Sequence, residues 1–285
     1  MNTIATQQYR EKYLKSTLEH ALRNALVAEK ICNVNRDNSY VIKAPYQTAP
    51  TTTVQAVTTG TYNVSAWTTT NDSLTVTEIF YSAEHIFDFE DTLSDFNIFA
   101  ARVDDLTYSV MTKIDQFVLN VLGTDATGSY TTPVGGFTTA ANINVILSNL
   151  ISKVAGFAEM YKGLYLVIEN TDVPGFIQAQ ATNGFSFADA ALNNGFMTNY
   201  MGVDIHVIRT GTFVTSTIGT RSDLAMSGHR LFGVKGVTTY AAPRGIKYEE
   251  KSVTGKTGKE VVVYGYIGAK VWTPKSDLTV DITLA

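Results

Sequence analysis

The sequence predicts an α+β fold, and three patterns in its 285 residues lead to this prediction. Apolar residues follow helical spacing from residue 92 to residue 122. Helices and strands then alternate, and from His229 onward strand patterns dominate. Such a mixture places at least one sheet beside helices around a hydrophobic core.

The composition is that of an ordinary globular protein, with 45% hydrophobic and 17% charged residues. A chain of this length buries a sizeable core, as one large domain or two ordinary ones, without disulfides or metals. Cys32 has no second cysteine to pair with, and the four histidines lack the spacing of a zinc site. No run approaches the roughly 18 apolar residues of a membrane span. We expect a soluble protein made in a reducing cytoplasm, with no metal, no cofactor and no membrane partner.

The first predicted helix, residues 7–31, carries a narrow apolar stripe in which Leu14, Leu18, Leu22 and Leu26 recur at every fourth position. It precedes every segment that could build a core. Two alternatives follow: the helix docks on its own domain, or it forms an arm that lies on a neighbouring molecule.

Residues 40–77 form a Thr-rich stretch, and its β-branched residues and turn signals near Gly60 and Asn71 predict a long β-hairpin. The stretch has too few large apolar residues to bury both faces of such a hairpin. Because a half-polar, two-stranded ribbon is not stable alone, we expect it to lie against another surface.

The stretch "EHIFDFEDTLSD" concentrates one histidine and five carboxylates in twelve residues, which raises the question of a metal or acid–base site. Strand alternation separates His85 from Glu84 and Asp88, so one ion could not collect them without a bend. A hydrolase or lyase that uses Glu84, His85 and Asp88 is therefore an alternative that strand geometry opposes. The favoured interpretation is a polar strand face followed by a helix start that side chains of residues 92–95 cap.

The predicted helix over residues 92–122 is roughly 42 Å long, whereas an average globular helix has about 12 residues. Gly123 is expected to end it. A rod of this length implies an elongated subunit.

A second unit follows, with predicted helices at residues 142–160 and 172–180 and predicted strands at residues 164–170 and 202–210. Their alternation indicates an α/β layer with a central sheet. The strands that follow include the loop "TGKTGK", which has part of a phosphate-loop pattern. It lacks the glycine four residues before Gly-Lys-Thr and a helix afterwards, so we predict a polar hairpin tip.

Charge is segregated along the chain. Residues 1–43 hold seven basic and four acidic residues, residues 72–105 hold nine acidic residues against Arg102 alone, and residues 229–285 hold nine basic and five acidic residues. This pattern suits a protein that meets copies of itself, and we expect the acidic block of one copy to pair with the basic termini of another. Specific DNA readout is not expected.

Four stretches carry a resemblance to a known family. They are "FYSAEHIFDFEDTLSDFN" before the long helix, "MTKIDQFVLNVLG" at its end, and "HRLFGVKGVTTYAAPRG" followed by "VVVYGYIGAKVWTP" near the carboxyl terminus. Together with the order of the elements, they resemble the major capsid proteins of tailed bacteriophages, which have the Hong Kong 97 fold. The resemblance covers nearly the whole chain as a pattern of elements.

The resemblance implies a Hong Kong 97-like capsid fold with an N-arm, an extended β-hairpin loop, a long spine helix, a peripheral domain and an α/β axial domain. It also implies that the loop lies over the adjacent subunit and that the axial tips meet around the capsomer axes. The implied boundaries are 1–39 for the N-terminal arm, 40–77 for the extended loop, 78–137 with 241–285 for the peripheral domain, 92–122 for its spine helix, and 138–240 for the axial domain.

The resemblance further implies a major capsid protein rather than an enzyme. Such a chain self-assembles, as hexamers and pentamers, into the icosahedral shell of a virion, encloses the DNA genome, and is made in the cytoplasm of the host bacterium. Implied partners are further copies, a portal protein, and packaged DNA that lies nearby without specific contacts. Because the chain starts at Met1 with no room for a scaffolding segment, the scaffold is expected to be a separate protein or absent. Candidate contacts between subunits are Leu14, Leu18, Leu22, Trp67, Asp88, Glu90 and Asp91.

Two other functions remain as alternatives. An encapsulin-like compartment that packages a cargo enzyme would keep the fold and change the contents of the shell. A phage tail or fibre protein is disfavoured, because a long helix and an α/β unit do not resemble a repetitive β structure.

Overall fold

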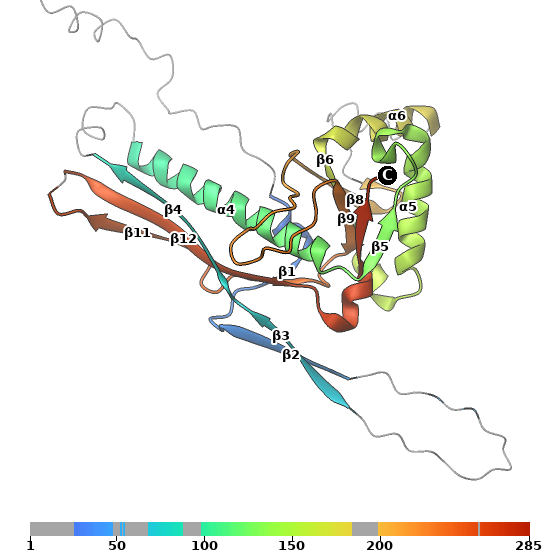
Figure 1. Ribbon diagram of the computed structural model, residues 1–285, viewed down its shortest axis with the longest axis horizontal. Helices are drawn as coiled ribbons and strands as arrows, with labels where there is room; N and C mark the ends of the chain where they lie inside the picture. The colour runs from blue at the N-terminus through green and yellow to red at the C-terminus, as the bar shows by residue number, and fades with distance from the viewer. Residues whose placement is uncertain are drawn as a thin grey trace, which may run out of the picture.

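The computed structural model describes residues 26–47, 52, 54, 68–87, 98–183, 199–255 and 257–285. Figure 1 shows an elongated subunit in which the helix α4 (Ile98–Thr124) crosses from one sheet to another, and a two-stranded ribbon projects from the body. The predicted mixture of helices and sheets is confirmed. No helix among these residues is long and apolar enough to cross a bilayer.

Helix α4 confirms the predicted long helix, although residues 92–97 and their expected caps lie outside the described residues. Its carboxyl-terminal half is buried almost all round: Phe117, Val118 and Val121 are buried apolar residues, and Asn120 is a polar side chain buried among them. The expectation that Gly123 ends the helix is wrong, since α4 continues to Thr124. A Cβ atom on Gly123 would lie 2.1 Å from Cε of Met226, so a larger residue here would require the buried Met226 side chain to shift.

One sheet lies under the amino-terminal part of α4, with β12 at its centre. Strand β12 pairs antiparallel with β4 on one side and with β10 and β11 on the other, and β1 pairs with β10. The polar tip predicted for "TGKTGK" connects β11 to β12. The strands of this sheet are β1 (Asn33–Asn35), β4 (Glu78–Ile86), β10 (Thr239–Ala241), β11 (Ile246–Ser252) and β12 (Lys259–Lys270).

The other sheet has six strands in the order β5-β13-β9-β6-β8-β7. Helices α5 (Ala140–Val154) and α6 (Val173–Asn183) cover one face, and the carboxyl-terminal end of α4 packs on the other. Strand β6 is therefore buried on both faces, as its uninterrupted apolar run indicates. The strands are β5 (Gly128–Thr131), β6 (Leu164–Glu169), β7 (Asn199–Tyr200), β8 (Val203–Ile208), β9 (His229–Val234) and β13 (Thr279–Thr283). Short 3-10 turns are η1 (Gly136–Thr138), η2 (Ala158–Lys162), η3 (Asn170–Asp172) and η4 (Thr273–Leu278).

Strand pairing departs from the expected domain boundaries at two strands. β5 and β13 fall within the ranges expected for the peripheral domain, 78–137 and 241–285, yet both join the six-stranded sheet. β13 pairs with β9 and with β5, so the end of the chain returns to complete that sheet. Pairing of this kind depends on contacts distant in sequence, which strand periodicity does not report.

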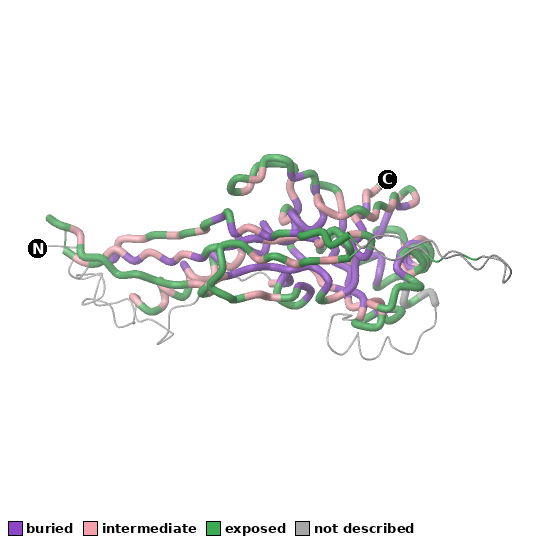
Figure 2. Tube along the Cα trace, turned by 90° about the horizontal axis from the view of Figure 1, so that it is seen from below, coloured by how far each residue is buried: buried purple, intermediate pink, exposed green. Residues whose placement is uncertain are grey.

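The ribbon confirms the predicted hairpin at its base. β2 (Val41–Gln47) and β3 (Thr69–Thr75) pair antiparallel, from Val41 opposite Thr75 to Gln47 opposite Thr69. Leu74 and Val76 are buried in a small cluster with Ala241, and farther out the side chains are mostly exposed. Figure 2 shows buried residues gathered in the body of the subunit.

Only residues 26–31 of the predicted first helix are described. The prediction of one continuous helix to residue 31 is wrong, because Leu26 and Val27 are not helical and a separate short helix, α2 (Ala28–Ile31), starts after them. The amides of Val27 and Ala28 donate to Oδ1 of Asp115 on α4, at 2.8 and 2.6 Å. Asp115 thus accepts hydrogen bonds from the first amides of α2, a role that a capping side chain normally performs. This contact fixes the position of α2 on α4.

Candidate functional site

Of the charged residues in "EHIFDFED", the structure describes Glu84 and His85, and their side chains do not converge. Glu84 faces α4, where its carboxylate lies 3.7 Å from the guanidinium of Arg102. His85 lies on the other side of β4, with Nε2 3.1 Å from the carbonyl oxygen of Thr257, and its ring packs edge-on against Phe87. Asp88 lies outside the described residues. Within the described part of the chain, no group of three His, Cys, Asp or Glu side chains could hold a metal ion.

The carboxylate-bearing face of β4 is the inner one. Phe80 on that face packs against Phe117 of α4 with ring centroids 5.5 Å apart, and Glu78 is only 4% exposed. Two large side chains of the strand point outward: Ile79 is 50% exposed and Tyr81 is 70% exposed. Carboxylates are tolerated on the inner face of this strand because side chains of the covering helix and hydroxyl groups of the loop pair with them.

The outward face of the sheet is an aromatic patch, which we call the tyrosine face and define as Ile79, Tyr81, Tyr264 and Tyr266. Tyr81 lies opposite Tyr264, and Ile79 lies opposite Tyr266 in the antiparallel register. The two β12 rings meet edge to face with centroids 5.9 Å apart. An exposed cluster of large apolar side chains on one sheet face is typical of an interaction surface.

The second surface is the outer part of the ribbon formed by β2 and β3, where the described side chains are mostly exposed. A salt bridge of 2.5 Å between Asp72 and Lys270 anchors its base, and Thr273 donates from its amide and hydroxyl to Asp72 at 2.9 Å. Burial raises the pKa of Asp72, but the bonds from Lys270 and Thr273 outweigh it and hold that pKa below its usual range. Part of the acidic block 72–105 is therefore neutralised within the subunit.

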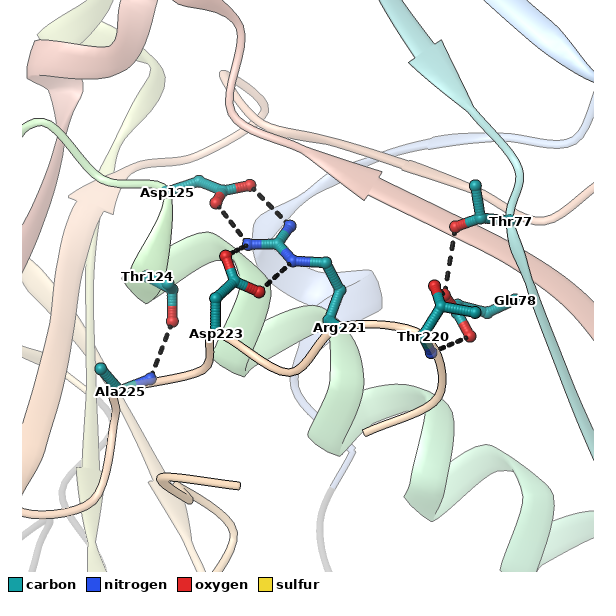
Figure 3. Close-up of polar contacts among 8 residues, drawn as sticks. All are labelled: Thr77, Glu78, Thr124, Asp125, Thr220, Arg221, Asp223 and Ala225. Carbon is teal, nitrogen blue, oxygen red and sulfur yellow. Dashed lines mark hydrogen bonds and ion pairs between the residues drawn. The ribbon is translucent and has the colours of Figure 1, made fainter. Parts of the chain in front are cut away.

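A long loop, residues 209–228, joins the six-stranded sheet to α4 and β4. Figure 3 shows Arg221 between Asp125 and Asp223, with guanidinium nitrogens 2.8 Å and 2.7 Å from the two carboxylates. The bond from Arg221 lowers the pKa of Asp223. Beside it, the amide of Thr220 donates to the carboxylate of Glu78 at 2.9 Å. The loop consequently ties the start of β4 and the end of α4 to the sheet from which it arises.

Asn120 of α4 forms hydrogen bonds with the same loop. Its side chain is fully buried, donates to the carbonyl oxygen of Thr212 at 2.8 Å, and accepts from the amide of Val214 at 2.8 Å. Sequence reasoning missed this role, although a lone asparagine within an otherwise apolar helix end, "FVLNVLG", is a signal for it.

A buried charge network was also missed by sequence reasoning. Arg230 on β9 is 3% exposed and forms ion pairs with Asp172 and Glu169, the latter at 3.2 Å. Asp172 is 2% exposed and also accepts from the amide of Glu169. The only hint in the sequence is an arginine at the start of an apolar strand, "HRLFGV". The network ties β9 to the start of α6.

His206 on β8 makes the stability of this region dependent on pH. Burial, followed by the nearby cations Lys235 and Lys30, lowers the pKa of His206 to about 4, and Asp204 opposes the shift. As pH falls from about 6.5 through about 4, the unfolded chain binds a proton that the folded chain resists, so the free energy of unfolding decreases. We expect His206→Gln to lose less stability than the wild type between pH 7 and pH 4.5, measured by chemical denaturation. An identical loss in both proteins would contradict this assignment.

None of the seven candidate contact residues can be placed. Leu14, Leu18, Leu22, Trp67, Asp88, Glu90 and Asp91 all lie outside the described residues. Their roles stay predictions. The surfaces that the structure describes are instead the tyrosine face and the outer part of the ribbon.

Comparisons with known proteins find relatives by structure only. No family model matches the chain, and a search of curated proteins finds no relative. Solved structures match over nearly the whole length. A chain from the capsid of the cyanophage P-SCSP1u has a TM-score of 0.76 at 13% identity, covering 98% of this chain and 94% of its own.

Two further matches are similar in extent. A chain of Mycobacterium phage Che8 has a TM-score of 0.73 at 13% identity, with coverage of 96% of this chain and 97% of its own. A chain from the capsid of the native GTA particle has a TM-score of 0.70 at 12% identity, with coverage of 100% and 99%. The predicted fold is confirmed: this chain has the Hong Kong 97-like fold of tailed-phage capsid proteins.

Proposed function

We propose that this chain is the major capsid protein of a tailed bacteriophage, which self-assembles into an icosahedral shell around the DNA genome. The observation that carries the proposal is the full-length match to chains from phage and GTA capsids. The ribbon supports it independently, because two strands that lie largely outside any core need a partner surface. The matched capsids give no support to the encapsulin-like alternative.

In this proposal, residues 1–39 are the N-arm and residues 40–77 are the extended loop. Residues 138–240 form the axial domain, now with β5 and β13 added, and the rest of 78–137 and 241–285 forms the peripheral domain around the spine helix. Copies meet as hexamers and pentamers, with a portal protein at one vertex and a separate scaffolding protein or none. The shell protein is made in the bacterial cytoplasm and resides in the virion, and it catalyses no reaction.

The tyrosine face is proposed as the surface on which a neighbouring ribbon lies. It is a flat sheet face with exposed apolar side chains, and the ribbon is an unsupported pair of strands rich in threonine. Each such contact contributes only a modest free energy of association. Repeated around a closed shell, the contacts act together and stabilise the particle.

Electron microscopy of the purified protein, with and without a candidate scaffold, tests the shell. We expect closed shells or capsomer rings from the wild type and none from Tyr81→Glu, because a charge would be buried at the contact. Tyr81→Phe keeps the ring and should assemble normally. The unfolding free energy of both variants should stay within about 0.5 kcal/mol of wild type, since Tyr81 is exposed in the subunit.

Two outcomes would contradict these proposals separately. A wild-type protein that stays monomeric at high concentration and varied salt would overturn the shell. Normal shells from Tyr81→Glu would overturn only the assignment of the tyrosine face.

A further inference from the structure

A groove of about 420 Å³ runs beside α4, between that helix and the segment that leads from β10 to β11. An engineered protein cavity of only about 150 Å³ accepts benzene, so this groove has room for at least two leucine-sized side chains. Its apolar lining comes from both sides. It consists of Thr107, Met111, Ile114, Tyr240, Ala242 and Ile246.

Four of the polar groups that line the groove already have partners, and Arg244 and Tyr240 line it as well. The hydroxyl of Thr107 donates to the carbonyl oxygen of Val103 at 2.7 Å, which leaves its methyl group for the groove. Asp115 accepts from the amides that begin α2, and Arg36 pairs with Glu29 at 3.2 Å. The groove therefore favours apolar side chains over an ion or a polar ligand.

The chain itself enters the body at this groove. Leu26 lines it, and residues 1–25 precede Leu26 along the chain. In the sequence, Leu26 is the last member of the stripe that includes Leu18 and Leu22, four residues apart. An apolar stripe with that spacing is what a helix needs in order to bind in a hydrophobic groove.

The lengths also agree. Thr107 and Ile114 are seven residues apart on α4, which is about 10 Å, and in the proposed helix Leu18 and Leu22 are about 6 Å apart along the axis, which fits within that length. We propose that residues 14–25 bind as a helix in the groove of their own chain, with Leu18 and Leu22 against its apolar lining. Because Leu26 already lies in the groove, the effective concentration of the segment is high, on the order of mM.

This inference selects the own-chain alternative for the first helix and does not rest on shell formation. It can be tested on the soluble, unassembled full-length chain. Cys32 is a silent background thiol, because it is buried and burial raises its pKa to about 12.

The first experiment pairs Leu22→Cys with Met111→Cys, and compares this with Asn24→Cys paired with Met111→Cys. In the proposed helix, Asn24 lies on the face opposite the one that carries Leu22. Under mild oxidation we expect an intrachain disulfide, seen as a fast-migrating monomer on a non-reducing gel. It should form about tenfold faster for the Leu22 pair, which corresponds to ~1.4 kcal/mol. Equal rates for the two pairs, or a disulfide-linked dimer in place of the monomer, would overturn the proposal.

The second experiment measures thiol labelling of Thr107→Cys in the groove. We expect the double substitution Leu18→Glu with Leu22→Glu to raise the labelling rate by about tenfold, as the groove opens. Asn24→Glu, which adds charge off the stripe, should leave the rate unchanged. An unchanged rate in the double variant would overturn the proposal. Shells are scored separately by microscopy, so an intact crosslink without shells would count against the proposed function alone.

Discussion

Replacing Arg230 with leucine is expected to lower the free energy of unfolding by about 3–5 kcal/mol, because two buried carboxylates lose their cation. Asp172 and Glu169 cannot move to solvent, since one caps the turn before α6 and the other accepts from the amide of Gly211 at 3.1 Å. A loss of this size is a large part of the roughly 5–15 kcal/mol that stabilises an ordinary domain. Chemical denaturation at pH 7 measures it.

The matched control is Arg36→Leu. That arginine pairs with Glu29, but its side chain is 67% exposed, and an exposed pair contributes about 0–1 kcal/mol. A variant that combines Arg230→Leu with Glu169→Gln and Asp172→Asn should regain part of the stability, because the unpaired charges are gone. If Arg230→Leu and Arg36→Leu proved equally mild, the network would not stabilise the fold.

The second large effect is expected from Asp115→Ala. The substitution leaves the amides of Val27 and Ala28 without an acceptor in a buried position. Each unsatisfied buried donor costs about 1–3 kcal/mol, so for the two amides we expect a loss of about 2–6 kcal/mol by chemical denaturation. Hydrogen exchange at the two amides should accelerate as α2 frays.

Asp115→Asn separates the acceptor from the charge. Burial raises the pKa of Asp115, which means that the surroundings disfavour its charge, although the two amides partly compensate. Asparagine keeps an oxygen in the same place, so stability should remain within about 1 kcal/mol of wild type. A loss as large as that of the alanine variant would show that the charge, and not the hydrogen bonds, stabilises this junction.

Local patterns in the sequence were sufficient to predict most of the helices and strands. The spine helix, the hairpin at the base of the ribbon, and the strands β6, β8 and β12 follow directly from the spacing of apolar residues, because each element must present an apolar face to the core. The alternation along β4 also correctly kept His85 apart from Glu84.

Which face of a strand is turned toward the core could not be predicted from local patterns in the same way. β4 turns its carboxylates inward and Tyr81 outward, since Arg102 and the loop at Thr220 supply partners that are distant in sequence. Gly123 was assigned to helix termination by its residue type, whereas in the structure it lies inside α4, packed against the side chain of Met226.

The sequence by itself determined the fold class, the order of the elements and the unsupported ribbon, because these depend on propensity and on periodicity within a few turns of chain. Only the tertiary structure decided that β5 and β13 complete the six-stranded sheet, that Arg230 is buried between two carboxylates, and that a groove lies where the chain enters the body. Each of these depends on residues far apart in sequence meeting at one place, and such meetings leave no local pattern from which they could be inferred.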